Sequence, residues 1–167
     1  MSMKGQAHKF GDDVNTDYII AGKYKYKIKN MAELARHVFE ELRPGFYKEV
    51  SEGDFVVAGD NFGCGSSREQ APLVIQEAGI SAVLVRSCAR IFYRNAINIG
   101  LPVLECDTTA IEEGDVLEID PLAGVIKNVT QDITIPAQPL SPTMMTILCD
   151  GGLAEHLRKH GRFAFEE

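Results

Sequence analysis

The chain has 167 residues, of which 45% are hydrophobic, and this size and composition fit one folded domain with a buried core. Its formal net charge of −7 argues against a general surface for nucleic acid or anionic membranes, so an anionic ligand would have to be held by local groups. Because residues 1–6 lack the apolar stretch of a secretory signal, we expect a cytoplasmic protein with a single domain over residues 1–167.

The first two thirds of the chain alternate between short apolar runs and segments with helical spacing. We expect a strand at residues 7–10, then a polar turn, and a helix at residues 31–42, where apolar side chains recur three and four positions apart. Further along, the pattern predicts strand, helix, strand, helix and strand, at residues 55–58, 73–78, 81–86, 90–99 and 103–106. This order indicates parallel strands joined by right-handed crossovers.

The last third has a different composition. Short β segments are predicted at residues 116–119, 124–127 and 132–135, and a closing helix at residues 152–160. The longest uncharged stretch, residues 133–149, contains three prolines, which argue against a membrane span. We interpret it as a loop leading into a strand. These patterns alone predict an α/β fold with a β-rich C-terminal part.

A segment rich in glycine and serine, Gly63 to Glu69, lies between a predicted strand and a predicted helix. Gly63 and Gly65 would let the backbone turn tightly and approach a ligand, and the first amides of the helix favour an anion. The planar guanidinium of Arg68 suits a carboxylate. The same letters also fit a capping box, with Ser66 as N-cap and Glu69 three residues further on. Both interpretations can hold together.

Other polar groups have plainer interpretations. Asp13, Asn15 and Asp17 resemble the start of a calcium loop, but the glycine and glutamate that such a loop needs are missing, so we expect an Asx-type turn. His156 and His160 have the spacing of a metal pair, yet no carboxylate lies between them, and we expect a solvated helix end without metal.

The cysteines are widely separated and form no C-x-x-C pair: Cys64, Cys88, Cys106 and Cys149. This spacing argues against a zinc ribbon or a self-contained iron–sulfur motif and indicates free thiols. Arg90 and Arg94 share a face of a predicted helix, where they would reach a ligand, contact a partner chain or form ordinary surface ion pairs.

Three blocks in the same order carry a resemblance to one family: Asn-Thr-Asp-Tyr-Ile at residues 15–19, the glycine-serine segment at 63–69, and residues 89–102. Together they resemble the small subunits of the isopropylmalate dehydratase and homoaconitase group, relatives of the aconitase swivel domain. The resemblance covers essentially the whole chain. It implies the swivelling β/β/α fold, an α/β domain with a mainly parallel sheet, flanking helices and additional C-terminal β structure.

The resemblance implies hydro-lyase chemistry, in which water is removed from a hydroxy dicarboxylic acid and added back. Residue matching assigns to Ser66, as an alkoxide, the removal of a proton next to a carboxylate. We expect the helix N-terminal amides, Ser67 and Arg68 to stabilise this alkoxide. Arg68 and Gly65 would also bind the substrate.

The resemblance also implies that Thr16 and Asp17 border the site and orient the serines or Arg68. In the family a [4Fe–4S] cluster with one open iron polarises the leaving hydroxyl. Because this chain lacks the cysteines for such a cluster, we expect no cofactor here and a large iron–sulfur subunit as partner, with neither nucleic acid nor membrane bound.

The segment that selects the side group of the substrate in this family corresponds to Lys23, Tyr24, Lys25, Tyr26 and Lys27. If extended, it would place the lysines on one side, which also fits a solvated edge or loop. Homoaconitase-type chains tend to have an arginine near the position of Tyr26, so we expect an apolar side group, although Lys25 or Lys27 could replace the missing guanidinium.

The resemblance favours dehydration of 3-isopropylmalate, a step of leucine biosynthesis. Dehydration of 2,3-dimethylmalate, a methyl-substituted malate or homoaconitate stays open as an alternative. The residues alone also leave open a non-catalytic anion-binding module in which Ser66 only caps a helix.

Overall fold

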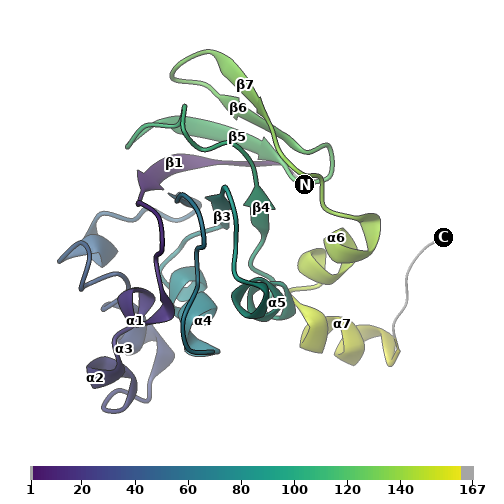
Figure 1. Cartoon of the computed structure of the whole chain (residues 1–167). Coiled ribbons are helices and arrows are strands. Elements are labelled where there is room, and N and C mark those ends of the chain that lie inside the picture. The colour runs from purple at the N-terminus through teal and green to yellow at the C-terminus, as the bar shows by residue number, and fades with distance from the viewer. Residues whose placement is uncertain (1, 163–167) are drawn as a thin grey trace.

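The computed structural model describes residues 2–162, and seven strands within this range form one sheet in the order β4-β3-β2-β1-β5-β6-β7 (Figure 1). The parallel strands are β1 (Met3–Lys9), β2 (Phe55–Val57), β3 (Ala82–Val85) and β4 (Val103–Glu105). The antiparallel strands are β5 (Val116–Asp120), β6 (Val125–Asn128) and β7 (Ile133–Pro136).

Strand β1 joins the two halves of the sheet. Its residues 3–6 pair antiparallel with β5, whereas its residues 7–9 pair in parallel with β2. The α/β fold with flanking helices and additional C-terminal β structure is therefore confirmed, and the complete sheet is mixed because the C-terminal strands extend it. Met1 and residues 163–167 lie outside the described residues, so the single domain over residues 1–167 stays a prediction.

Two apolar cores lie on opposite faces of the parallel strands, since successive side chains of a strand point to opposite sides. Val56, Val83 and Val85 belong to the core that the helices cover. Phe55 and Leu84 belong to the other core, which strands β5 to β7 close with Leu117, Ile119, Ile126 and Ile135. Figure 1 shows the resulting layers, with antiparallel strands above and α1 to α5 below the parallel strands.

The helical segments are α1 (Thr16–Ile19), α2 (Gly22–Lys25), α3 (Met31–Ala35), a 3₁₀ turn (Phe46–Lys48), α4 (Gln70–Glu77), α5 (Arg90–Asn98), α6 (Pro142–Cys149) and α7 (Leu153–His160). Helices α4 and α5 connect β2 to β3 and β3 to β4, as the alternating pattern predicted. The loop after β2 and the start of α5 therefore leave the same edge of the sheet.

Helix α3 ends earlier than its apolar spacing predicted. The predicted helix at residues 31–42 stops at Ala35, and turns follow. Phe39 has a left-handed φ of 54°, and its amide donates to the Ile19 carbonyl (2.9 Å) instead of continuing a helix. Its fully buried ring stacks on that of Phe10, with 4.4 Å between the ring centroids. Burial of this ring thus overrides the helical pattern.

The interpretation of residues 133–149 as a loop leading into a strand was wrong. The segment begins as β7 and ends as α6, which the side chain of Ser141 caps by accepting from the Met144 amide (3.2 Å). Pro142, one of the prolines that argued against a membrane span, occupies the first turn of α6, where its missing N–H would have no partner anyway. No helix among residues 2–162 is long and apolar enough to cross a membrane.

Candidate functional site

The segment after β2, residues 63–69, forms an irregular loop that we call the serine loop. Gly63 and Gly65 have φ values of 75° and 89°, a left-handed conformation that glycine adopts readily. A Cβ atom on Gly63 would lie 2.3 Å from Cγ of Phe92, so the loop packs directly against α5. The Gly63 amide also donates to the Val14 carbonyl (2.7 Å).

Thr16 and Asp17 both contact the serine loop. The Thr16 amide donates to the Cys64 carbonyl (2.9 Å), and its hydroxyl donates to the Ser66 carbonyl (2.6 Å). The carboxylate of Asp17 forms an ion pair with Nη2 of Arg68. The structure therefore brings together two blocks that lie about fifty positions apart in the sequence.

Asn15 shapes the turn that presents these two residues. Its side-chain oxygen accepts from the amides of Asp17 (2.8 Å) and Tyr18 (3.2 Å) and caps α1. The predicted Asx-type turn is thus confirmed. It directs the first turn of α1 toward the serine loop.

Arg68 is held in place before any ligand binds. Its side chain is only 13% exposed, Nη1 donates to the Ile20 carbonyl (2.7 Å), and Nη2 pairs with Asp17. These contacts fix the orientation of the guanidinium, which favours recognition of a carboxylate. They use one contact of each terminal nitrogen, leave further N–H donors free, and partly neutralise the charge.

The predicted capping box was wrong. Helix α4 begins at Gln70 with Glu69 as its N-cap, and no side chain caps it. The carbonyl of Ser66 is instead held by Thr16, which keeps this residue in the loop. The side chain of Ser66 therefore does not cap the first amides of α4. Ser66 and Ser67 are exposed, and neither hydroxyl has a hydrogen-bond partner among the described residues.

A pocket of ≈ 360 Å³ lies between the serine loop and the start of α5. Its walls comprise two groups of residues: Thr16, Gly63, Gly65, Ser67 and Arg68 on one side, and Ala89, Arg90, Ile91, Phe92 and Asn95 on the other. Ser66 does not line the pocket itself but stands between two residues that do. We call this cavity the serine pocket.

Helix α5 supplies a wall that the sequence reasoning did not assign to the site. No side chain caps this helix, and its first turn lines the serine pocket. The positive end of a helix therefore faces the pocket, but it belongs to α5 and not to α4. A sequence signal was present, because Ile91 and Asn95 are four apart and share one face of the helix.

The predicted selecting segment, residues 23–27, is not extended, because its first part forms α2. Lys23 pairs with Glu41 (2.5 Å), and the Tyr24 ring stacks on His37 with 4.0 Å between the centroids. The extended edge is therefore not observed, whereas the exposure of Lys23, Tyr26 and Lys27 fits the solvated loop considered for this segment. Helical turns break the alternation that would place all lysines on one side.

Tyr26 lies in the same segment and is 79% exposed. A Cβ atom on Gly22 would lie 3.4 Å from the Tyr26 ring and 3.9 Å from Nη2 of Arg68, so the segment borders the guanidinium. The ammonium of Lys25 lies 5.8 Å from the centroid of the Tyr26 ring, and Lys27 is exposed.

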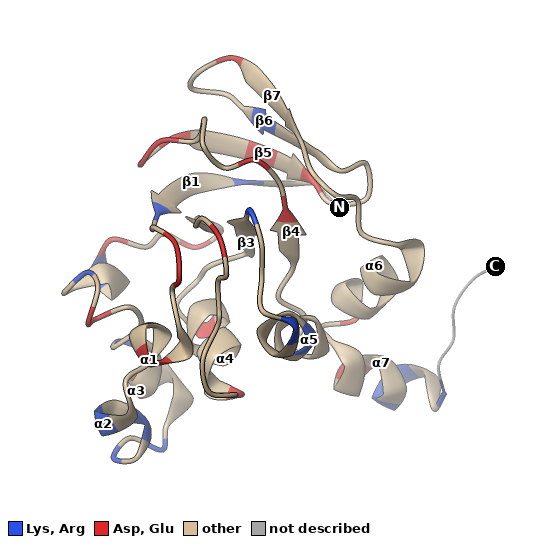
Figure 2. Ribbon diagram, viewed as in Figure 1, with Lys and Arg blue, Asp and Glu red and all other residues tan. Residues whose placement is uncertain are grey.

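Basic side chains flank the serine loop although the chain is acidic overall. Figure 2 shows them on α2, with Lys23 and Lys25, and on α5, with Arg90 and Arg94. The two arginines of α5 are exposed and form no ion pair within residues 2–162, so the surface ion pairs considered for them are not observed there. Local groups thus provide the positive charge that the net charge does not.

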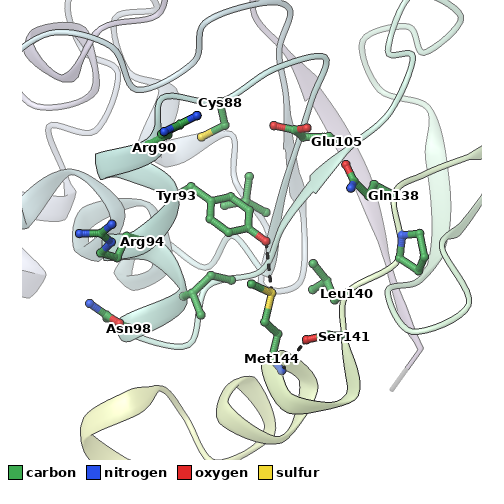
Figure 3. A pocket seen from close by; sticks show the side chains of 13 residues that line it. Cys88, Arg90, Tyr93, Arg94, Asn98, Glu105, Gln138, Leu140, Ser141 and Met144 are labelled. Carbon is green, nitrogen blue, oxygen red and sulfur yellow. Dashed lines mark hydrogen bonds between the residues drawn. The ribbon is translucent and has the colours of Figure 1, made fainter.

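A larger pocket of ≈ 640 Å³ lies on another side of α5, between this helix, β4 and the start of α6 (Figure 3). The hydroxyl of Tyr93 donates to Sδ of Met144 (3.5 Å) across it. Burial raises the pKa of the Cys88 thiol to about 12, so this thiol stays protonated and is a poor nucleophile at neutral pH. Arg90 lines both pockets.

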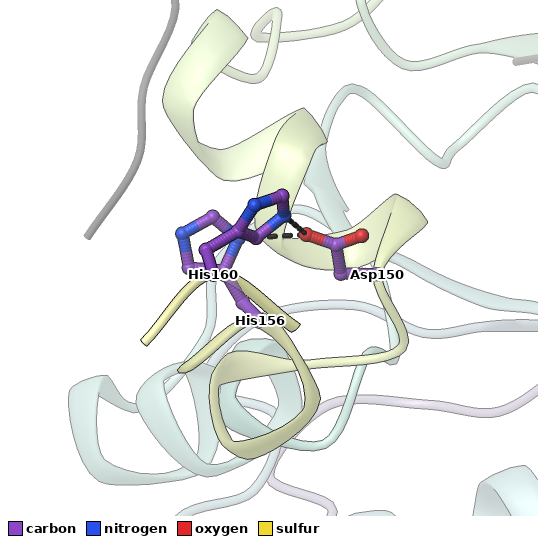
Figure 4. A group of neighbouring side chains, drawn as sticks. All are labelled: Asp150, His156 and His160. Atoms are coloured by element: carbon purple, nitrogen blue, oxygen red, sulfur yellow. Dashed lines mark hydrogen bonds and ion pairs between the residues drawn. The ribbon is translucent and has the colours of Figure 1, made fainter. Parts of the chain in front are cut away.

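The solvated helix end expected for the two histidines of α7 is observed for His160, which is exposed, but not for His156. His156 is fully buried, with Nδ1 2.7 Å from Oδ2 of Asp150, and Nε2 of His160 lies 3.0 Å from the same oxygen (Figure 4). Hydrogen bonds from His156 and Lys159 lower the pKa of Asp150 to about 2. Although these groups could surround a cation, the Lys159 ammonium already lies 3.1 Å from the carboxylate. We interpret the cluster as a tie between α6 and α7.

The cysteines of the chain do not converge. Within the described residues, one group of three potential metal ligands occurs, formed by Asp150, His156 and His160, and it contains no cysteine. All four cysteines are free thiols. The residues of this chain therefore do not fit an iron–sulfur cluster, which needs several thiolates directed at one point.

Comparisons with known proteins agree with this fold. The model of the aconitase C-terminal domain matches residues 3–109. The chain is 53% identical over 161 residues to 3-isopropylmalate dehydratase small subunit 2 of Archaeoglobus fulgidus, covering 96% of this chain and 98% of that protein. It is 60% identical over 152 residues to small subunit 1 of the same organism, covering 90% and 94%.

A crystal structure of 3-isopropylmalate dehydratase from Methanocaldococcus jannaschii matches with a TM-score of 0.92 and 47% identity, covering 96% of both chains. The chain therefore belongs to the aconitase C-terminal domain family. Within that family, the relatives that align with nearly the whole chain put it in the group of 3-isopropylmalate dehydratase small subunits.

Proposed function

We propose that the chain is the small subunit of a hydro-lyase that dehydrates and rehydrates the hydroxy dicarboxylic acid 3-isopropylmalate. This reaction is a step of leucine biosynthesis, and we place the protein in the cytoplasm. The observation that carries this proposal is the serine pocket, which Ser67 and the fixed guanidinium of Arg68 line, with Ser66 as the neighbouring residue of the loop. The same group of curated relatives supports the choice of substrate.

Arg68 binds one carboxylate of the substrate in this proposal. The Ile20 carbonyl and Asp17 hold the guanidinium in one orientation, so little conformational entropy is lost when the ligand binds. Ser67 lines the same pocket and can donate its hydroxyl to the carboxylate. Gly65, which lacks a side chain, leaves room for the substrate beside them.

Ser66 acts as the base that removes the proton next to a carboxylate. Its hydroxyl does not cap α4 and is free to face the substrate, while Thr16 anchors its carbonyl. A serine is a strong enough base only as an alkoxide, which needs nearby positive charge. The guanidinium of Arg68 and the uncapped start of α5 provide that charge on the two sides of the pocket.

The departing hydroxyl needs an acid that this chain does not supply, and we assign it to a large iron–sulfur partner subunit. When bound there, a [4Fe–4S] cluster supplies a Lewis acid for the hydroxyl group. This assignment is consistent with the scattered thiols of this chain. The serine pocket would then be completed between the two subunits.

The side group of the substrate distinguishes the candidates. Tyr26, whose segment borders Arg68, offers an aromatic contact to an alkyl group, which favours isopropylmalate over homoaconitate. The ammonium of Lys25, 5.8 Å from the centroid of the Tyr26 ring, is the cation that could bind a further carboxylate. Dimethylmalate and methyl-substituted malates stay as alternatives with smaller alkyl groups. The non-catalytic alternative loses its main support because Ser66 caps no helix.

Reconstitution of the chain with its large subunit under anaerobic conditions tests the proposal. The pair should convert 3-isopropylmalate faster than the alternative substrates, and Ser66→Ala should lower kcat by at least ~10²-fold. Because the Ser66 hydroxyl makes no hydrogen bond with residues 2–162, the melting temperature should not change. Ser67→Ala is the matched comparison and should mainly raise KM. Near-normal turnover by Ser66→Ala would refute the assignment of the base.

A further inference from the structure

Asn95 occupies an unusual position on α5. Its half-buried side chain lines the serine pocket together with Ser67 and Arg68. Asn98, three residues further along the same helix, is exposed and lines the larger pocket instead, as Figure 3 shows. The two asparagines therefore belong to different cavities.

The carboxamide of Asn95 has no hydrogen-bond partner among residues 2–162. In the free chain water can satisfy this group, but a bound substrate and a partner subunit would remove that water. A polar group without a partner is then costly, so it needs an acceptor or donor from the ligand. Its NH₂ group offers two donors, which suit a carboxylate.

A dicarboxylate needs donors on more than one side of the pocket. Asp17 and the Ile20 carbonyl each contact one terminal nitrogen of Arg68, and the N–H groups that remain free lie with the Ser67 hydroxyl on the loop side. A substrate with two carboxylates presents four oxygens, and those that face α5 need donors from that wall. Arg90 and Asn95 are the polar side chains that line it.

We propose that Asn95 is a further substrate-binding residue, whose carboxamide donates to a carboxylate oxygen of the hydroxy dicarboxylic acid from the α5 wall of the serine pocket. Ile91, one turn earlier and 55% exposed, gives the same wall an apolar part next to the amide. This wall thus combines the polar groups of Arg90 and Asn95 with an apolar side chain between them. This inference rests on the proposed function.

The test compares three variants in the reconstituted pair. Asn95→Ala should lower kcat/KM for 3-isopropylmalate roughly 10- to 100-fold, mainly through KM, because a hydrogen bond to a charged group is lost. Asn95→Asp keeps the size but places a negative charge beside the carboxylate, so the loss should be larger. Asn98→Ala, the matched control on the same helix, should stay within about twofold of wild type.

Melting curves and calorimetric titration with 3-isopropylmalate complete the test. Unchanged melting temperatures with weakened binding in both Asn95 variants support the inference. It is overturned if Asn95→Ala binds as well as Asn98→Ala, or if Asn95→Asp is no worse than Asn95→Ala. If the wild-type pair does not turn over but binds the acid through Asn95, the proposed reaction fails and the binding role stands. Absence of binding to wild type overturns both.

Discussion

Replacing Gly63 with alanine tests whether the serine loop is held by its packing against α5. An alanine would have to adopt a φ of 75°, which costs roughly 1–2 kcal/mol. Its Cβ would also lie 2.3 Å from Cγ of the buried Phe92, and overpacking of this kind costs about 1–3 kcal/mol. Together these effects should lower the free energy of unfolding by about 2–5 kcal/mol.

Gly45→Ala is the matched control. Gly45 has a similar φ of 80°, but nothing lies within 4 Å of a Cβ atom built there, so only the backbone cost applies. Thermal and urea unfolding followed by circular dichroism measures both variants. For a chain of this length, Gly63→Ala should lower the melting temperature by roughly 4–20 °C. Equal losses in the two variants would refute the inferred contact between the loop and α5.

Three further predictions concern specificity, thiol reactivity and pH. Tyr26→Arg should raise kcat/KM for a substrate with an extra carboxylate, relative to kcat/KM for 3-isopropylmalate, by roughly 10-fold or more in the reconstituted pair. An unchanged ratio of these two values would place Tyr26 outside the site. Iodoacetamide at pH 8 should modify the exposed Cys149 but spare Cys88 and Cys106, because burial raises the pKa of each of these two thiols to about 12. Mass spectrometry of the intact chain and its peptides measures the labelling, and modification of Cys88 or Cys106 before Cys149 would contradict the prediction. Asp150→Asn should lower the melting temperature at neutral pH, because the pKa of Asp150, about 2, lies below its ordinary 3.8 and its ion pairs stabilise the fold while it is ionised. The difference between the variant and the wild type should shrink as the pH falls from about 4 to 2 and vanish below that. A difference that does not change between pH 7 and pH 2 would show that the effect is steric.

Local pattern was enough to predict most of the sheet and helices α4, α5 and α7. Short apolar runs mark buried strands, and the helices between them follow from apolar spacing, neither of which depends on distant residues. The pattern failed where packing overrode it. Phe39 leaves the helical conformation and buries its ring, and residues 142–149, expected as part of a loop leading into a strand, form α6.

The sequence by itself determined the residue types of the site, because the glycines, serines and arginine of the serine loop are adjacent in the chain. Only the tertiary structure decided what surrounds them. In the structure the Thr16 hydroxyl donates to the Ser66 carbonyl, and Ser66 does not cap α4. The start of α5, with Asn95, forms the opposite wall of the serine pocket. Sequence periodicity reports only the faces of single elements, whereas contacts between segments far apart in the chain depend on how the whole sheet and its helices pack.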